Sequence, residues 1–232
     1  MGRPGREFTG LVAKREVTVR AFIVGNGPSL QHTNLDRLVG EVSYGMQRIH
    51  LIYPKTAWRP THWVCADRDP DTDGRWLQDA LFHLQQGYPC YFRPHWIDDL
   101  PHDTNAVFMD MCAHWDAGVG DPRTPTEWHL PVVCRYGGSM AAALQLAALE
   151  GYDQLYVVGA DLGLTEDPTT NHFDPEYGRR LPAEEVGRDN QMLKNMHAVA
   201  HRSASAMGVG IYNASTGGQL DEYPRVEFDK LF

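Results

Sequence analysis

The chain lacks long hydrophobic runs, a surplus of positive charge, internal repeats and low-complexity tracts. No apolar segment approaches the roughly 20 residues of a membrane-spanning helix, so we expect no membrane span. The net charge of −9 argues against nonspecific binding to nucleic acid or to anionic membranes, because an acidic surface is repelled by both. With 42% hydrophobic and 22% charged residues, the composition is that of an ordinary globular protein.

Cysteine is also scarce, and its spacing excludes the Cys-x-x-Cys motifs of metal and redox sites. The four cysteines are Cys65, Cys90, Cys112 and Cys134. We interpret them as buried free thiols in a reducing compartment. The first residues lack the apolar segment of a secretory signal. We therefore predict a cytoplasmic protein with a flexible leader over residues 1–18 and a single catalytic domain over residues 19–232.

What the chain does contain is an alternation of short apolar runs, polar loops and helical spacings. We expect strands near residues 20–25, 42–51, 61–66, 90–92, 154–159 and 209–212. We expect helices near residues 34–38, 76–86, 140–149 and 184–207, with loops and short pieces over 93–130. This alternation predicts an α/β, Rossmann-like fold with a mostly parallel sheet and helices on both faces.

The loop after the first predicted strand has the sequence Gly-Asn-Gly-Pro-Ser. Glycine at the end of a parallel strand permits a tight turn and the close approach of a ligand. A loop of this kind that opens into a helix turns its amide groups toward an anion. We therefore expect Gly25, Asn26, Gly27, Pro28 and Ser29 to bind a phosphate-bearing nucleotide. The third glycine of the dinucleotide fingerprint is missing, so a plain strand-to-loop turn is the alternative.

Polar residues follow the ends of the other predicted strands as well. They are Gln47, Asp67, Asp161 and the segment Asn213–Gly218. Because the carboxyl ends of parallel strands meet at one edge of a sheet, we expect these residues to gather there. Asp161 would contact a metal, bond a ribose or acceptor hydroxyl, or cap the following loop. Asn213, Ser215 and Thr216 would bind the base or the ribose, and a plain turn is the alternative.

Two clusters have the composition of metal sites. Asp67 and Asp69 have the Asp-x-Asp spacing that suits Mg²⁺ or Mn²⁺, although an acidic turn has the same pattern. His197 and His201 lie one helical turn apart, but no third ligand is evident. We interpret this histidine pair as part of a solvated helix face.

Taken together, these motifs resemble two related protein groups. The opening Gly25–Leu30 is similar to that of small bacterial sialyltransferases that use CMP-sialic acid, and to that of the 6-hydroxymethylpterin diphosphokinase MptE-like family. The likeness continues at Arg135–Ser139, Gly151–Asp161 and Asn171–Phe173, and Tyr212–Gly218 with Tyr223–Val226 resembles the close of MptE-like proteins. It covers nearly the whole chain from residue 20.

The resemblance implies roles for individual residues. Asn26, Gly27 and Ser29 would hold the nucleotide, and His172 matches a lid histidine that acts as general base. Arg135 matches an arginine that lines the donor site, with Gly138 and Ser139 beside it.

Two positions depart from the sialyltransferase pattern. Gln47 stands where that group has a donor-binding asparagine, and Gly163 stands where it has a phosphate-binding tyrosine. Tyr177 would be a substitute for that tyrosine. These departures leave the donor sugar open.

We therefore predict a glycosyltransferase that moves a sugar from a nucleotide-sugar to a hydroxyl acceptor, either a surface glycan or a hydroxylated DNA base. His172 would remove the acceptor proton, because the pKa of histidine lies near neutrality. Asp161 would also be catalytic, and Arg135, Arg179, Arg180 or a metal ion would meet the leaving-group charge. The polar segment 164–190 would form a lid.

Two alternatives stay open. An MptE-like enzyme would transfer pyrophosphate from ATP to a pterin-type alcohol, would need Mg²⁺, and would depend on Asp67 and Asp161 more than on His172. A nucleotide-binding module would retain affinity without turnover. The oligomeric state is likewise undetermined, with a homo-oligomer among the options.

Overall fold

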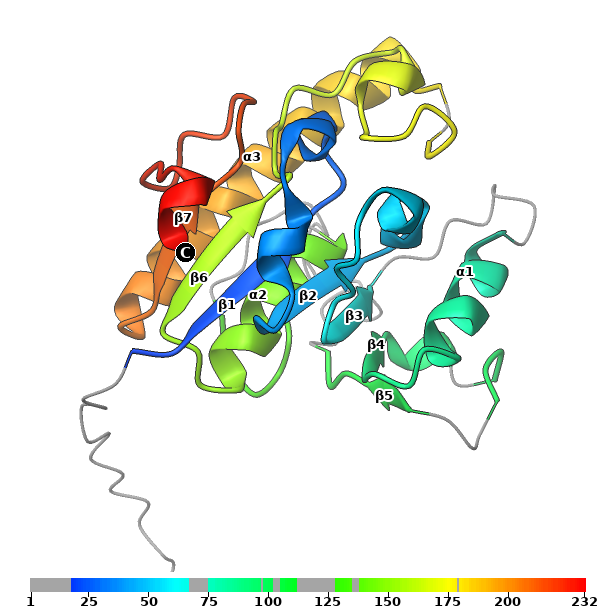
Figure 1. Ribbon diagram of the computed structural model, residues 1–232, viewed down its shortest axis with the longest axis horizontal. Helices are drawn as coiled ribbons and strands as arrows, with labels where there is room; N and C mark the ends of the chain where they lie inside the picture. Colours follow the sequence, from blue (N-terminus) through cyan, green and yellow to red (C-terminus); the bar gives the residue numbers. More distant parts are fainter. Residues whose placement is uncertain are drawn as a thin grey trace, which may run out of the picture.

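The computed structural model describes residues 18–66, 75–96, 98–101, 105–111, 128–134, 138–178 and 180–232. The expected leader therefore lies outside the described residues, except for residue 18. In the described part of the chain, seven strands form one parallel sheet in the order β5-β4-β3-β2-β1-β6-β7 (Figure 1). The strands are β1 (Arg20–Val24), β2 (Ser43–Met46), β3 (His62–Cys65), β4 (Cys90–Phe92), β5 (Ala106–Phe108), β6 (Gln154–Val158) and β7 (Gly210–Asn213).

The α-helices of the described residues are α1 (Arg75–Leu84), α2 (Gly138–Leu149) and α3 (Ala183–Ala206). Short 3₁₀ helices supplement them: η1 (Pro28–His32), η2 (Leu35–Leu38), η3 (Ile49–Lys55), η4 (Pro94–Trp96), η6 (Pro168–Thr170) and η7 (Phe228–Leu231). None of the helices in the described ranges is long and apolar enough to cross a membrane.

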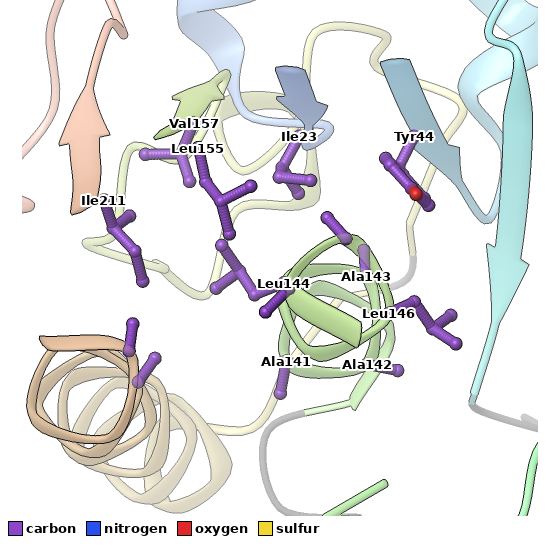
Figure 2. Close-up of a cluster of buried hydrophobic side chains, with 14 of the residues drawn as sticks. Ile23, Tyr44, Ala141, Ala142, Ala143, Leu144, Leu146, Leu155, Val157 and Ile211 are labelled. Atoms are coloured by element: carbon purple, nitrogen blue, oxygen red, sulfur yellow. The ribbon is translucent and has the colours of Figure 1, made fainter. Parts of the chain in front are cut away.

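Helices α2 and α3 cover one face of the sheet. Alternate residues of each strand point to this face, among them Ile23, Tyr44 and Val157. Figure 2 shows α2 beneath these strands and beside α3, with Leu144 directed at the sheet. Helix α2 is apolar around its whole circumference because the sheet and α3 enclose it, as expected of a buried helix.

The other face is covered by α1 and by the 3₁₀ helices other than η6. Phe22 and Trp63 pack there against Leu30 of η1, Ala80 of α1 and Phe228 of η7. Helical elements thus cover both faces, which confirms the predicted fold class. Cys65, Cys90 and Cys134 are buried free thiols as expected, and Cys112 lies outside the described residues.

Three expected elements differ from those observed. The second strand ends at Met46 instead of residue 51, because Gln47 has a positive φ of 49° and η3 follows. Strand β5 lies within the segment expected to form loops. The expected lid over 164–190 includes the first two turns of α3 and carries the buried Phe173.

The order of the strands creates a reversal between β1 and β6. The chain builds outward from β1 to β5 and then returns through α2 to place β6 on the other side of β1 (Figure 1). Ligands of open α/β sheets bind outside the carboxyl ends of the strands at such a point, where the loops diverge. The topology therefore directs attention to the loops after Val24 and Val158.

Candidate functional site

A pocket of about 190 Å³ lies at this reversal point. Its wall is formed by Gly25–Pro28 after β1, Met46 of β2, Met140 of α2, residues 159–164 after β6, residues 170–172, Tyr177, and Leu193, Met196 and His197 of α3. Three predicted site elements meet here: the Gly-Asn-Gly turn, Asp161 and His172. The pocket therefore brings together segments that are far apart in the sequence. Of the strand-end residues expected at one edge, Gly25–Pro28 and Asp161 line it, whereas Gln47 and Asn213 do not.

Glycine is required in the turn because the loop after β6 packs directly against it. A Cβ atom on Gly27 would lie 2.3 Å from Oδ2 of Asp161, and one on Gly25 would lie 2.6 Å from the carbonyl oxygen of Gly159. Real Cβ atoms do not approach other atoms so closely, so a side chain at either position would displace the neighbouring loop.

The amide groups of the turn are already bonded within the chain. The amide of Gly25 donates to the carbonyl of Val158 at 2.8 Å, and that of Gly27 to the carbonyl of Gly159 at 2.8 Å. Oδ2 of Asp161 accepts the amide of Ser29 at 2.7 Å. The amides of Gly25, Gly27 and Ser29 therefore already have partners within the chain, and phosphate binding by the turn stays a prediction. A carboxylate occupies the start of η1, which has only five residues.

Asp161 is the acidic group of the pocket, and half of its carboxylate is unpartnered. The residue is 5% exposed, and among the described residues its Oδ1 atom has no hydrogen-bond partner. The same is true of Oδ1 of Asn26 and Oγ of Ser29. Buried polar atoms normally find partners, so a bound ligand or water is expected at these atoms.

Asn26 connects the turn to β2 and to the segment before α3. Its Nδ2 atom donates to the carbonyl of Met46 at 3.1 Å and to the hydroxyl of Tyr177 at 2.8 Å. Its carbonyl accepts the amide of Phe173 at 3.0 Å. Asn26 thus joins the turn to the expected lid, both through its side chain and through its backbone carbonyl.

His172 lies against Tyr177 on the pocket wall. The two rings stack with their centroids 4.0 Å apart. Burial lowers the pKa of His172 to about 4, although a hydrogen bond to the backbone of Asn26 acts in the opposite direction. The imidazole is therefore neutral at pH 7 and has a ring nitrogen available to accept a proton.

Arg48 holds the backbone beside Tyr177, a role that no pattern in the sequence indicates. Its Nη1 atom donates to the carbonyls of Glu176 and Tyr177 at 2.8 and 2.9 Å. Its Nε atom lies 3.2 Å from Oδ2 of Asp79 in α1. The Asp79–Arg48 pair thereby fixes the turn that carries Tyr177.

His197 is a pocket residue that sequence reasoning placed wrongly. It is 3% exposed rather than part of a solvated helix face, and its Nδ1 atom lies 2.9 Å from the hydroxyl of Tyr223. Burial lowers the pKa of His197 to about 3. The apolar neighbours at helical spacing, Leu193, Met196 and Ala200, were the signal that this side of α3 faces inward.

Gln47 and Ser139 do not line the pocket but bond to one another. Nε2 of Gln47 donates to Oγ of Ser139 at 2.9 Å, and the amide of Ala66 donates to the same oxygen at 2.9 Å. These contacts join the ends of β2 and β3 to the start of α2 at Gly138. The structure thus gives the pair a role in positioning strand ends.

Asn213 and Ser215 likewise bond within the chain. The Asn213 side chain donates to the carbonyl of Leu220 at 2.8 Å and accepts the amide of Ser215 at 2.9 Å. Oγ of Ser215 accepts the amide of Ala160 at 3.0 Å. Thr216 lines a different pocket of about 500 Å³. The three residues expected to bind base or ribose therefore shape the last loop, and only Ser215 contacts the loop after β6.

Several predicted residues lie outside the described residues: Asp67 and Asp69, Arg135 and Arg179. Arg180 lies on the surface 3.6 Å from Glu166. Within the ranges that the structure covers, no group of three or more His, Cys, Asp or Glu side chains is placed to hold a metal ion. The described pocket wall also includes no lysine or arginine.

Comparison with protein-family models, with curated proteins and with solved structures gives no match for this chain.

Proposed function

We propose that the chain is a glycosyltransferase that binds a nucleotide-sugar in the pocket at the β1–β6 reversal and transfers the sugar to a hydroxyl acceptor. The observation that carries the proposal is the meeting of Gly25–Pro28, Asp161 and His172 on one pocket wall. A proton acceptor and an unpartnered carboxylate oxygen at the carboxyl edge of a parallel sheet support a group transfer between bound ligands.

The proposed reaction assigns a step to each group. The acceptor oxygen attacks the anomeric carbon, the bond from that carbon to the phosphate oxygen breaks, and the nucleotide leaves with the electron pair. His172 takes the acceptor proton, and its stacking on Tyr177 keeps the ring in place. Oδ1 of Asp161 accepts a hydroxyl hydrogen of a substrate.

The charge on the phosphate requires a cation. The described wall supplies none, so Arg135 or a divalent ion would have this role. Oδ1 of Asp161 and Oδ1 of Asn26 are oxygen donors without partners among the described residues, and hard cations prefer oxygen ligands. A bound Mg²⁺ or Mn²⁺ would neutralise charge on the leaving phosphate.

A ligand panel tests the proposal. The melting temperature of the chain is measured with CMP-, UDP- and GDP-sugars and with ATP, each with and without Mg²⁺, because a ligand that binds the native state raises apparent stability. The stabilising compound is then incubated with the chain, and release of free nucleotide is followed. Stabilisation and turnover by a nucleotide-sugar support the proposal. Stabilisation by ATP with Mg²⁺ alone would favour pyrophosphate transfer instead.

A further inference from the structure

We propose that the inner part of this pocket binds a planar heteroaromatic ring, with methionine and leucine side chains on the ring faces and His197 donating a hydrogen bond to one ring acceptor atom. The inference deepens the proposed function and rests on it only in placing a substrate in this pocket. The ring would belong either to the base of the donor nucleotide or to a pterin-type acceptor.

The apolar side chains of the wall are of the kinds that pack well on the faces of an aromatic ring. Three methionines, Met46, Met140 and Met196, come from β2, α2 and α3 and line the same pocket. Leu162, Leu164 and Leu193 line it as well. Thioether groups are polarizable and adapt to the surface of an aromatic ring, and their contacts with such rings are favourable. These six side chains of the pocket wall are therefore suited to a flat apolar surface.

His197 is the polar group within this apolar wall. Burial raises the pKa of Tyr223 well above its usual value, so its phenol keeps its proton. The structure gives that buried hydroxyl a single hydrogen-bond partner among the described residues, which is Nδ1 of His197 at 2.9 Å. We assign the hydroxyl as the donor to Nδ1, which places the imidazole proton on Nε2.

The Nε2–H group is available to a ligand. It has no hydrogen-bond partner in the part of the chain that the structure describes, and His197 lines the pocket wall. Because the His197 ring is neutral at pH 7, it donates a hydrogen bond without adding a charge. Such a group suits a carbonyl oxygen or a ring nitrogen rather than a phosphate.

The charges of the pocket also favour a neutral ring as the ligand. The ionisable side chains on the described wall are Asp161, His172, Tyr177 and His197. At pH 7 the two histidines and the tyrosine are neutral, so the only charge among these four is the negative carboxylate. A neutral ring fits this wall without a charged partner, whereas a phosphate beside it needs the cation that the described wall does not supply.

Direct titration tests the inference. Cytidine, uridine, guanosine, adenosine and 6-hydroxymethylpterin are each titrated calorimetrically into the full chain and into four variants. His197→Leu removes the donor, His197→Gln restores one, and Tyr223→Phe removes the hydroxyl that orients the ring. His201→Gln is the matched control, because His201 lies one turn further along α3 and off the pocket wall.

We expect at least one ring compound to bind, with affinity roughly tenfold lower in His197→Leu and largely retained in His197→Gln and His201→Gln. Tyr223→Phe should weaken binding less than His197→Leu and provides a second test if the leucine variant does not fold. A nucleoside response would identify the donor base, and a pterin response the acceptor.

Two results would overturn the inference: no ring compound binds, or the ligand that binds has equal affinity for His197→Leu, Tyr223→Phe and the parent chain. A nucleotide-sugar that is still turned over in either case leaves the glycosyltransferase proposal intact. Conversely, His197-dependent binding of a nucleoside without turnover of any nucleotide-sugar would support the ring site and count against the transferase.

Discussion

At the scale of single residues, the pocket is defined by buried groups whose ionisation differs from that of the free amino acid. His172 and His197 are neutral because their burial penalises the charged ring. One carboxylate oxygen of Asp161 accepts a hydrogen bond from the amide of Ser29. The other has no partner among the described residues. Each of these features gives a residue-level prediction.

Replacement of His172 by Gln should lower kcat by roughly 10²–10⁴ and leave donor affinity nearly unchanged, because the residue would act in proton transfer rather than in donor binding. Kinetics with saturating donor and calorimetric donor titration measure the two effects separately. His32→Gln is the control, since His32 is exposed and lines the other pocket. If kcat of the variant equals that of the parent chain, His172 is not the base.

The pH profile tests the ionisation of the same residue. With a pKa of about 4, His172 is already deprotonated at pH 5, so kcat/KM should not fall between pH 7 and pH 5 through loss of this base. Rates are measured over this interval while circular dichroism verifies that the chain stays folded. An acid limb with an apparent pKa of 6 to 7 would contradict the account.

Asp161 should contribute to stability through its bond to Ser29. Asp161→Ala leaves a buried amide without an acceptor and should lower the free energy of unfolding by about 1–3 kcal/mol. Asp161→Asn retains an acceptor oxygen and should cost less. Urea denaturation of the two variants measures the difference, and equal loss in both would show that the Ser29 bond is not the cause.

At the scale of elements, the turn after β1 is determined by the loop after β6. Gly27→Ala places a methyl group 2.3 Å from Asp161 and should destabilise the chain by about 1–3 kcal/mol, with loss of ligand binding. Gly187→Ala is the matched control, because no atom lies within 4 Å of its new methyl group and alanine favours the helix interior. Thermal unfolding should show opposite shifts for the two variants.

The sequence predicted the elements that are marked by local signals, such as a helix cap or an apolar run between turn residues. The helix expected near residues 34–38 is η2, and Asn34 caps it because its side chain accepts the amide of Asp36. Strands β4 and β6 lie where apolar runs between turn residues placed them. Strand β2 ends early because of the left-handed backbone at Gln47. Strand β5 is an edge strand of three residues, and its apolar run is too short to distinguish it from the loops around it.

The segment before α3 illustrates what sequence could not supply. Its polar composition predicts a lid, and in this structure paired amide bonds fix the position of the segment. The side chain of Asn171 bonds both backbone groups of Thr165, and the side chain of Asn190 bonds both of Leu164. These contacts depend on three-dimensional partners that no local pattern in the sequence identifies.

At the scale of the whole molecule, buried neutral histidines should make stability depend on pH. Burial lowers the pKa of His83 to about 2, that of His172 to about 4 and that of His197 to about 3. The unfolded chain binds these protons near pH 6.5, whereas the folded chain does not. Their contribution is fully present above pH 6.5 and is lost as the pH falls toward the folded values.

The three residues together should lower the free energy of unfolding by at most about 4 kcal/mol per pH unit. Urea denaturation at pH 7.5 and pH 5.5 measures it, and the midpoint should be lower at pH 5.5. His83→Phe should reduce the difference between the two midpoints. Equal midpoints in the parent chain at both pH values would contradict the burial of these rings.

The position of the site also belongs to this scale. Polar residues after predicted parallel strands predicted a common edge, and the reversal between β1 and β6 brings Gly25–Pro28, Asp161 and His172 together there. Asn213 does not line that pocket, because its amide is used within its own loop. Hydrogen-bond partners across the fold thus determine which strand-end side chains line the pocket.

The structure of a complex with the nucleotide-sugar that stabilises the chain most would test the central claim directly. In that complex we expect the base to lie between Met140 and Met196, within hydrogen-bond distance of Nε2 of His197. We expect the acceptor side of the sugar to face His172. Nucleotide density in the pocket around Thr216 and Arg225, with the β1–β6 pocket empty, would contradict it.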